Sequence, residues 1–248
     1  MGGVRTEWSE RFAVRAYEIG ARGVVEPWTV CNLLQETAGR HVETLGWSIK
    51  QLGAKRQTWV LARLRVKVLG ELQLGDEAVV STWTAGASKA YAVREFRVED
   101  GSGRPVALAS SGWLLVDLAT RRPLRPPAEV AALGAGAPRA IEDAFARLPD
   151  MPPAAWTRTV RVGLSSLDMN RHANNVAIVT WLLDVLDGDA VAGRRLAELA
   201  VEFRAEARWA DPLVVEASAL AEPGRIAHRL LGDGGRELAR AVTQWVEA

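Results

Sequence analysis

The sequence predicts an α+β protein built from two copies of one unit, each a long helix wrapped by a curved antiparallel sheet. Two observations support this prediction. The chain repeats one order of segments, and each repeat has one stretch with helical apolar spacing followed by stretches that alternate like strands. With 248 residues, the chain can form two units of about 120 residues each.

The repeat is clearest where a strand runs through a turn into a helix. FAVRAYEIGARGVVEPWTVCNLLQETA, near the N-terminus, corresponds to RTVRVGLSSLDMNRHANNVAIVTWLLDVL, near residue 160. Pairing Val14 with Val160 aligns the two segments without a gap, at an offset of 146 residues. We therefore expect both copies to begin their helix in the same way.

Later segments match in the same order. Each copy has a strand, a polar turn that contains Asp76 or Asp211, and a second strand. Each then has a hairpin around a Gly-rich turn, and these hairpins end on Trp113 and Trp245. Three matches in one order indicate an internal duplication.

Each copy contains one apolar helix that needs a hydrophobic sheet to cover it. The first helix is predicted over residues 26–47 and the second over residues 174–186. A curved antiparallel sheet around each helix buries such faces, and this is the hot-dog arrangement, here in tandem. The apolar positions at near-helical spacing are Val30, Leu33, Leu34, Ala38, Val42 and Leu45 in the first helix and Val176, Val179, Leu182, Leu183 and Leu186 in the second.

The predicted domain organisation follows the repeat. Residues 1–125 form the N-terminal hot-dog repeat, residues 126–155 a linker, and residues 156–248 the C-terminal repeat. The linker is rich in Pro, Ala and Gly and has no convincing strand. Its middle, residues 140–148, is compatible with a short surface helix.

Composition excludes several classes of protein. The net charge of +1 argues against a dedicated nucleic-acid binder. No run of about 18 apolar residues is present, and the N-terminus lacks the pattern of a signal peptide. The single cysteine, Cys31, rules out an internal disulfide and fits a reducing compartment. We expect a cytoplasmic protein.

The candidate site is LDMNRHANN, residues 167–175, at the start of the second helix. Alternate residues of an extended segment point the same way, so Asp168, Asn170 and His172 are expected to face one small volume. The free N–H groups at the helix start, near Asn174 and Asn175, are expected to point there too. Such a site suits a carbonyl oxygen that becomes negative during a reaction.

The first copy does not contain this set. The alignment places Arg22, Val24 and Glu26 opposite the three residues of the second copy. A purely structural need for an acid, an amide and an imidazole should appear in both copies. The asymmetry therefore favours a functional site, although each Asp or Asn alone is an ordinary capping or turn residue. One histidine without a nearby cysteine supplies too few ligands for zinc, so no metal is expected.

The segment around the candidate site resembles that of a known family. SSLDMNRHANNVAIVTWLLD resembles the signature of the acyl-acyl carrier protein (acyl-ACP) thioesterases of plants and bacteria, in which an Asp-x-Asn-x-His segment opens the second hot-dog helix. VRAYEIGARGVVEPWTVCNLLQETAGRHVETLGW, TWVLARLRVKV and SSGWLLVDLATRRPLRPP are similar to the N-terminal repeat of that family. The resemblance covers nearly the whole chain.

The resemblance implies catalytic roles for Asp168, Asn170 and His172. VEFRAEARWAD matches the family's strand with a catalytic glutamate, which falls on Glu206. Many plant members have a cysteine after that glutamate, but here the residue is Ala207, so a cysteine nucleophile is not expected. Sequence alone leaves Glu206 open as an ordinary solvated acid, because Glu71 holds the equivalent place in the first copy.

The implied activity is hydrolysis of fatty acyl-ACP to free fatty acid and holo-ACP, which terminates fatty acid synthesis, by a bacterial enzyme without a cofactor. Asp168 would attack the thioester or position water, and His172 and Glu206 would move the protons. The resemblance places the acyl chain in the first repeat, against Val30, Leu33 and Leu34, although these residues also suit an ordinary core. Candidates for docking the acidic carrier protein are Arg121, Arg122, Arg125, Arg204 and Arg208.

Three alternatives stay open from the sequence. One is an acyl-CoA thioesterase of the same superfamily, and a second is a double hot-dog hydratase or dehydratase, whose motif looks unlike residues 167–175. The third is a lipid-binding module without turnover. The preferred chain length is not predicted, and either a monomer or a homodimer is compatible with two fused repeats.

Overall fold

The computed structural model describes residues 6–88, 90–142 and 145–248. The chain folds into two compact units, Met1–Phe145 and Ala146–Ala248. Among the described residues, no helix has both the length and the apolar character needed to cross a membrane.

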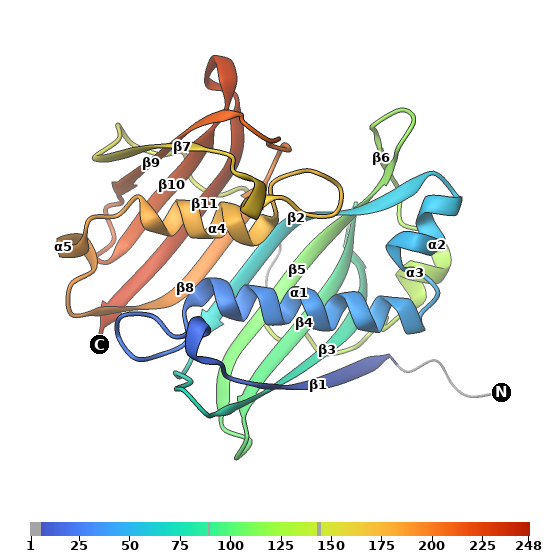
Figure 1. The fold of residues 1–248 in the computed structure, drawn as a ribbon. Helices are drawn as coiled ribbons and strands as arrows, with labels where there is room; N and C mark the ends of the chain where they lie inside the picture. Colours follow the sequence, from blue (N-terminus) through green and yellow to red (C-terminus); the bar gives the residue numbers. More distant parts are fainter. Residues whose placement is uncertain (1–5, 89, 143–144) are drawn as a thin grey trace. The chain divides into compact units, whose positions relative to one another are not determined.

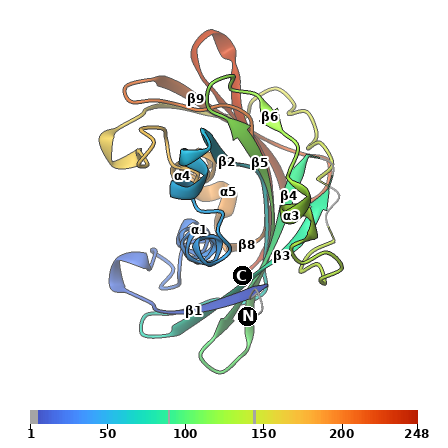
Figure 2. The ribbon, with the colours of Figure 1, turned by 90° about the vertical axis from the view of Figure 1, so that its right-hand side faces the viewer.

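The first unit is an antiparallel sheet with a long helix across it (Figure 1). Its strands lie in the order β1-β3-β4-β5-β2, and β6 pairs with β5. The long helix α1 packs against β1 and β3, on the concave side of the sheet, and the short α3 lies on the opposite side (Figure 2). The elements are β1 Glu7–Ala13, α1 Pro27–Thr44, α2 Ile49–Ala54, β2 Gln57–Val68, β3 Glu77–Ser88, β4 Tyr91–Asp100, β5 Pro105–Asp117, β6 Pro123–Leu124 and α3 Ala128–Ala132.

The second unit repeats this topology. Its strands lie in the order β7-β9-β10-β11-β8, which corresponds strand for strand to the first unit, and α4 packs against β9 and β10. The α+β class and the tandem hot-dog arrangement are therefore confirmed. The elements are β7 Trp156–Arg161, α4 Asn175–Asp184, α5 Gly188–Val191, β8 Arg194–Phe203, β9 Pro212–Ala219, β10 Arg225–Leu231 and β11 Glu237–Glu247.

Up to the start of the long helix, the two copies correspond at an offset of 148 residues, so the sequence alignment of this segment at 146 was wrong by two. The Val14 N–H donates to the Asp76 carbonyl (2.9 Å), and the Val162 N–H donates to the Asp211 carbonyl (3.1 Å). Val14 thus matches Val162 and not Val160. A shift of two residues keeps every strand side chain on its own face, so the apolar alternation alone could not detect it.

The pairing of the last hairpins is confirmed by one repeated contact. The Trp113 indole N–H donates to the Ser111 hydroxyl at 2.8 Å, two residues earlier on the same strand. The Trp245 indole N–H donates to the Thr243 hydroxyl at 2.9 Å in the same way. Indole N–H groups that are shielded from water need an acceptor, and both copies supply it from the same position.

Local sequence sets the ends of the long helices. Pro27 occupies the first turn of α1, where its missing N–H is not needed, and Gly46 ends the helix with a φ of +78°, a conformation that glycine adopts without a Cβ clash. Asn174 caps α4 by accepting a hydrogen bond from the Val176 N–H (2.9 Å). The α4 helix ends at Asp184, two residues before the predicted end.

Each unit buries a basic side chain on the strand that is third in its sheet order, β4 or β10. In the first unit, Arg94 donates to His41 Nδ1 at 2.8 Å and to the Thr82 hydroxyl at 3.1 Å, and burial lowers the pKa of Arg94 to about 10. In the second unit, His228 Nε2 lies 2.9 Å from the Thr243 hydroxyl, and burial lowers the pKa of His228 to about 4. Both basic side chains hydrogen-bond to uncharged groups, and His228 Nδ1 has no hydrogen-bond partner among the described residues.

The segment between the repeats binds to both sheets. In the first unit, the buried Glu95 carboxylate accepts from the Ala140 N–H (3.0 Å) and from Arg139 (2.5 Å). The predicted linker also contains α3, a helix that was not predicted from the sequence. The described residues of the helix suggested over 140–148 are not helical, and residues 143–144 lie outside the described part.

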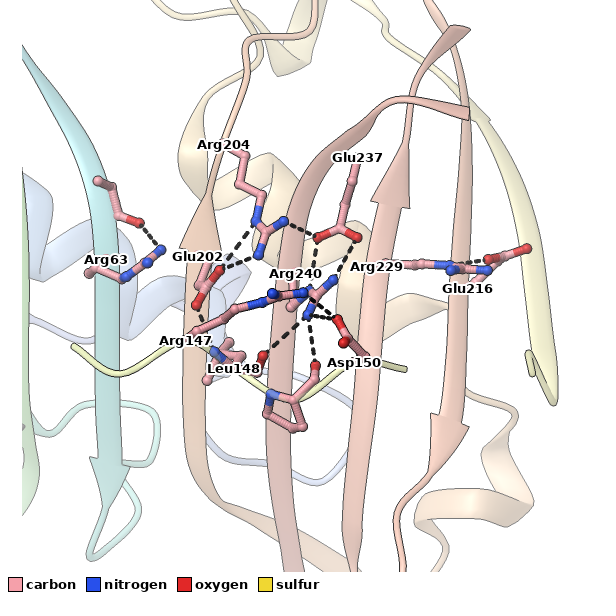
Figure 3. Close-up of polar contacts among 12 residues, drawn as sticks. Arg63, Arg147, Leu148, Asp150, Glu202, Arg204, Glu216, Arg229, Glu237 and Arg240 are labelled. Carbon is pink, nitrogen blue, oxygen red and sulfur yellow. Dashed lines mark hydrogen bonds and ion pairs between the residues drawn. The ribbon is translucent and has the colours of Figure 1, made fainter. Parts of the chain in front are cut away.

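Figure 3 shows the contacts that this segment makes in the second unit, with Glu202 of β8 and Arg240 of β11. The buried Glu202 carboxylate accepts from the Leu148 N–H at 2.7 Å. Arg240 donates to the carbonyls of Leu148 (3.2 Å) and Pro149 (3.0 Å) and to the Asp150 carboxylate (2.7 Å). Breaking one such partnership leaves a buried charge or backbone group without a partner, so this part of the segment is integral to the unit.

Stability should fall in mild acid because of His228. Its pKa is about 4 when folded and about 6.5 when unfolded, so the unfolded chain binds the proton more tightly. Stability present above pH 6.5 is therefore lost as the pH falls toward 4, by roughly 3 kcal/mol over the whole window. We expect His228→Gln to reduce the loss between pH 7 and pH 5, measured by urea unfolding at both values. An equal loss in the variant would contradict this assignment.

Candidate active site

The loop before α4 is closed by its own backbone. The Asp168 N–H donates to the His172 carbonyl (2.8 Å), and the Arg171 N–H donates to the Asp168 carbonyl (3.0 Å). Arg171 adopts a left-handed conformation with φ of +63°, which makes this tight turn possible. The Asn174 N–H then bonds to the Ser166 carbonyl (2.8 Å), which fixes where the helix starts.

The Asp168 carboxylate organises this loop. Its Oδ1 accepts from the N–H groups of Asn170 (2.8 Å) and His172 (3.1 Å). Its Oδ2 accepts from the Asn170 side-chain amide at 3.3 Å. The structure thus brings Asp168 and Asn170 together as predicted, and Oδ2 keeps room for a further hydrogen bond from water or substrate.

His172 and Glu206 form a pair. His172 Nε2 lies 3.2 Å from Glu206 Oε2, and the two side chains are 21% and 36% exposed. A neutral imidazole that donates its Nε2–H to the carboxylate keeps Nδ1 as an acceptor. This arrangement suits a base whose protonated form the carboxylate stabilises.

Backbone pairing holds Glu206 beside the loop. His172 forms an isolated antiparallel bridge with Arg208, and the Ala173 N–H donates to the Ala207 carbonyl (2.8 Å). Ala207 is fully buried, so Glu206 and Arg208 on either side of it share the opposite face, where His172 also lies. The turn that follows is fixed by Asp211, whose Oδ2 accepts from the Arg208 N–H (2.8 Å).

The helix start offers fewer free donors than the sequence suggested. Asn174 uses its side-chain oxygen to cap the Val176 N–H, so this N–H is not available to a ligand. The first helical hydrogen bond runs from the Ile178 N–H to the Asn174 carbonyl (3.1 Å). The N–H groups of Asn175 and Ala177 precede it and are therefore the candidates for binding an oxyanion.

The first copy has a different set at the same place. At the corrected offset, Asp168, Asn170 and His172 correspond to Gly20, Arg22 and Val24, not to Arg22, Val24 and Glu26 as the sequence alignment proposed. Arg22 forms an ion pair of 3.0 Å with Glu71, the counterpart of Glu206. The conclusion that only the second copy holds an acid, an amide and an imidazole stands with these new residues.

In the first copy, the space next to Gly20, the counterpart of Asp168, is occupied by another side chain. A Cβ built at Gly20 would lie 1.4 Å from Glu26 Oε1. The Glu26 carboxylate therefore fills the space where a side chain like that of Asp168 would begin. Glu26 precedes α1 as Asn174 precedes α4. The Asn174 side chain caps its helix, whereas the Glu26 side chain makes no capping hydrogen bond and lies against Gly20 instead.

Val30, Leu33 and Leu34, the predicted substrate-binding side chains, lie on the buried face of α1. The same face becomes polar further along, at Thr37 and His41. In this structure these residues form part of the core of the first unit. Their role in binding a substrate stays a prediction.

Neither cysteine chemistry nor a metal cluster is indicated by the geometry. Cys31 is buried, and burial raises the pKa of its thiol to about 12, so it is not a thiolate at neutral pH. Across the described ranges, no group of three or more His, Cys, Asp or Glu side chains is arranged to hold a metal ion.

Neither the backbone role of Asp211 nor the left-handed conformation of Arg171 was predicted from the sequence. Asp76 holds the corresponding turn of the first unit by accepting from the Gln73 N–H (2.8 Å), so the shared Asp was a signal for a turn-fixing carboxylate. Gly23, with φ of +77°, is the counterpart of Arg171 at the corrected offset. Aligning that glycine would have predicted the left-handed position.

The protein consists of two hot-dog units in tandem. Among the described residues it has a single candidate catalytic centre, formed by Asp168, Asn170, His172 and Glu206 near the start of α4. Two family models match the chain, the acyl-ACP thioesterase N-terminal domain over residues 5–133 and the acyl-ACP thioesterase C-terminal domain over residues 154–247. The chain belongs to the acyl-ACP thioesterase family.

Curated relatives agree with this assignment. The chain is 31% identical to a chloroplastic palmitoyl-acyl carrier protein thioesterase of Cuphea hookeriana, over 95% of this chain and 61% of the relative. It is 30% identical to the protein of the same description from Arabidopsis thaliana, over 95% of this chain and 63% of the relative. The chain thus spans about three fifths of the length of these relatives.

Solved structures show the same fold. An acyl-ACP thioesterase from Bacteroides thetaiotaomicron superposes with a TM-score of 0.89 at 21% identity, over 99% of this chain and all of that one. The 12:0-ACP thioesterase from Umbellularia californica superposes with a TM-score of 0.87 at 24% identity, over 99% of this chain and 95% of that one.

The role of Asp168 in holding the loop can be tested without an activity assay. Asp168→Ala removes the acceptor for two backbone N–H groups, whereas Asp168→Asn keeps an oxygen that can accept both. We expect faster amide hydrogen exchange at Asn170 and His172 in the alanine variant and near-normal exchange in the asparagine variant. Equal protection in the alanine variant would show that the carboxylate does not hold the loop.

Proposed function

We propose that this protein hydrolyses fatty acyl-ACP to free fatty acid and holo-ACP and thereby ends fatty acid synthesis. The observation that carries the proposal is the His172–Glu206 pair beside Asp168 and Asn170, present only in the second copy, in a chain of the acyl-ACP thioesterase family. The matched relatives are described as thioesterases of palmitoyl-acyl carrier protein and of 12:0-ACP.

The geometry supports attack by water. His172, oriented by Glu206, takes a proton from water through Nδ1 and later returns it to the departing thiolate. Asp168 accepts hydrogen bonds through Oδ2 and positions the water, while three donors already spread its negative charge and make it a poorer nucleophile. For this reason we favour direct water attack over an acyl-aspartate.

The negative oxygen formed in this attack needs donors. We assign the N–H groups of Asn175 and Ala177 to this role, because Asn174 occupies the N–H between them. The positive end of the α4 dipole adds to the same effect. One such donor is commonly worth about 10²–10³ in rate.

The partner in this proposal is an acidic acyl carrier protein, which an Arg-rich surface attracts. We place the reaction in the cytoplasm, where the lone, buried Cys31 thiol stays reduced. Either a monomer or a homodimer is compatible with the proposal, because the second repeat of one chain carries the complete polar set.

The direct experiment measures thiol release from acyl-ACPs of increasing chain length, with matched acyl-CoAs alongside. Preference for the carrier-linked esters supports the proposal. Turnover of CoA esters alone would move the protein to the acyl-CoA thioesterases. Binding of acyl chains without cleavage of either series would indicate a lipid-binding module.

The catalytic assignment predicts different effects at equivalent positions of the two copies. Glu206→Gln should lower kcat by about 10²-fold, because an amide does not stabilise the imidazolium. Glu71→Gln, its matched control in the first unit, should leave kcat unchanged. Asp168→Asn should also lose most activity while the fold survives, as judged by its circular dichroism. Equal kcat for Glu206→Gln and the wild type would remove Glu206 from the mechanism.

The acyl chain is proposed to lie against α1 in the first unit. Leu34→Ala removes buried volume there and should shift the chain-length profile of hydrolysis toward longer acyl groups, at a stability cost of about 2–5 kcal/mol. Leu230→Ala, a buried leucine of the second unit, is the control for that general cost. An unchanged profile in Leu34→Ala would place the chain elsewhere.

A further inference from the structure

Two residues next to the candidate site adopt a conformation that usually belongs to glycine. Arg171, in the loop before α4, has φ of +63°, and Ala210, in the turn after Glu206, has φ of +65°. Their counterparts in the first unit are Gly23 and Gly75, with φ of +77° and +88°. A side chain with a Cβ is strained at such a position and glycine is not. The second unit therefore has an arginine at a left-handed position that glycine occupies, without strain, in the first unit.

Arg171 is also unpaired. It is exposed, and neither it nor Arg208 forms an ion pair with any residue in the described part of the chain. Some other arginines of the second unit are paired, for example Arg158 with Asp184 and Arg229 with Glu216, whereas Arg236, like Arg171, forms no ion pair with the described residues. Arg204, an earlier docking candidate, is bound by Glu202 (2.7 Å) and Glu237 (3.1 Å), as Figure 3 shows, so it is not free for a ligand.

The first unit lacks both of these free cations. The counterparts of Arg171 and Arg208 are Gly23 and Gln73, which carry no charge. The one arginine of that loop, Arg22, is paired with Glu71. The positive charge is thus specific to the unit that contains His172 and Glu206.

The placement of the two arginines relates them to the reaction. Arg171 directly precedes His172, and Arg208 pairs with His172 through the backbone bridge and shares the face of Glu206. The same loop and turn expose two large apolar side chains, Met169 (82%) and Trp209 (63%). The surroundings of the pair therefore combine free guanidinium groups with exposed apolar surface.

We propose that Arg171 and Arg208 bind the phosphoryl group of the phosphopantetheine arm that carries the acyl thioester, and that Met169 and Trp209 cover the arm itself. This inference rests on the proposed thioesterase function. When the thioester reaches His172, the arm must leave the site over the surrounding surface, and the loop with Arg171 and the turn with Arg208 are part of that surface. Guanidinium groups match phosphate oxygens with paired N–H donors. Carrier-linked and CoA-linked substrates both have a phosphate at this end of the arm, as a phosphodiester in the first and as part of a diphosphate in the second.

The test begins with binding, so that it does not depend on turnover. Calorimetry compares 4′-phosphopantetheine with pantetheine on the full chain, as wild type, as R171G and as the double variant R171G/R208Q. We expect about fivefold tighter binding of the phosphorylated compound by the wild type, a smaller ratio in R171G, and a ratio near one in the double variant. Each substitution installs the residue of the first unit, and R171G also relieves the left-handed strain, so its thermal stability should not fall.

Two controls separate the proposal from general effects. R236Q removes an exposed arginine of the second unit that forms no ion pair with the described residues. A210G relieves the other left-handed position without changing charge. Both should keep the wild-type ratio between the two compounds. Loss of the ratio in R236Q would mean a diffuse charge effect and would overturn the assignment.

Kinetic measurements show whether the arginines contact the arm or the carrier protein. They also separate failure of the arm site from failure of the thioesterase function. KM should rise in R171G/R208Q for acyl-phosphopantetheine, acyl-CoA and acyl-ACP alike, with kcat and the KM for acyl-pantetheine unchanged. A rise confined to acyl-ACP would mean that the arginines contact the carrier protein surface and would overturn the arm site. Equal binding of the two compounds by the wild type would overturn it too. Arginine-dependent binding without hydrolysis of any thioester would retain the arm site and reject the thioesterase function.

Discussion

The candidate site depends on one antiparallel backbone contact between the loop before the helix and the turn after β8. The Ala173 N–H bonds to the Ala207 carbonyl and His172 bridges to Arg208, and this contact brings the Glu206 carboxylate to the imidazole. The first unit has the same contact, from the Val25 N–H to the Leu72 carbonyl (2.8 Å) with a bridge between Val24 and Gln73. The contact is therefore a property of the fold. The chemistry comes from the side chains that only one copy places on it.

This division explains what could be predicted from the sequence. The two-copy architecture followed from repeated apolar patterns, because burying a helix against a sheet imposes those patterns on both copies. The proximity of Asp168 and Asn170 followed from their spacing. The pairing of Glu206 with His172 joins residues 34 positions apart, and only the family resemblance pointed to it before the structure placed them 3.2 Å apart.

What could not be predicted depended on register and on backbone conformation. Alternation with a period of two residues cannot distinguish Val160 from Val162 as the partner of Val14, so the counterparts of the site residues were misassigned. The contacts of Glu95 and Glu202 with the segment between the repeats were also hidden. In a sequence, a buried glutamate in a strand cannot be distinguished from a solvated one. Only the structure shows its partners, which here are the N–H groups of Ala140 and Leu148.

The space around Gly20 has a consequence for the history of the duplication. A Gly20→Asp substitution would bring the new Cβ against the Glu26 carboxylate, so the flexible Glu26 side chain would have to move aside. Recovery of the whole polar set would also require an amide at position 22 and an imidazole at position 24, and Arg22 now holds the carboxylate of Glu71. Return of the polar set to the first copy therefore needs several substitutions. The first copy is free to diverge at these positions, whereas the second copy keeps the residues that the proposed reaction uses.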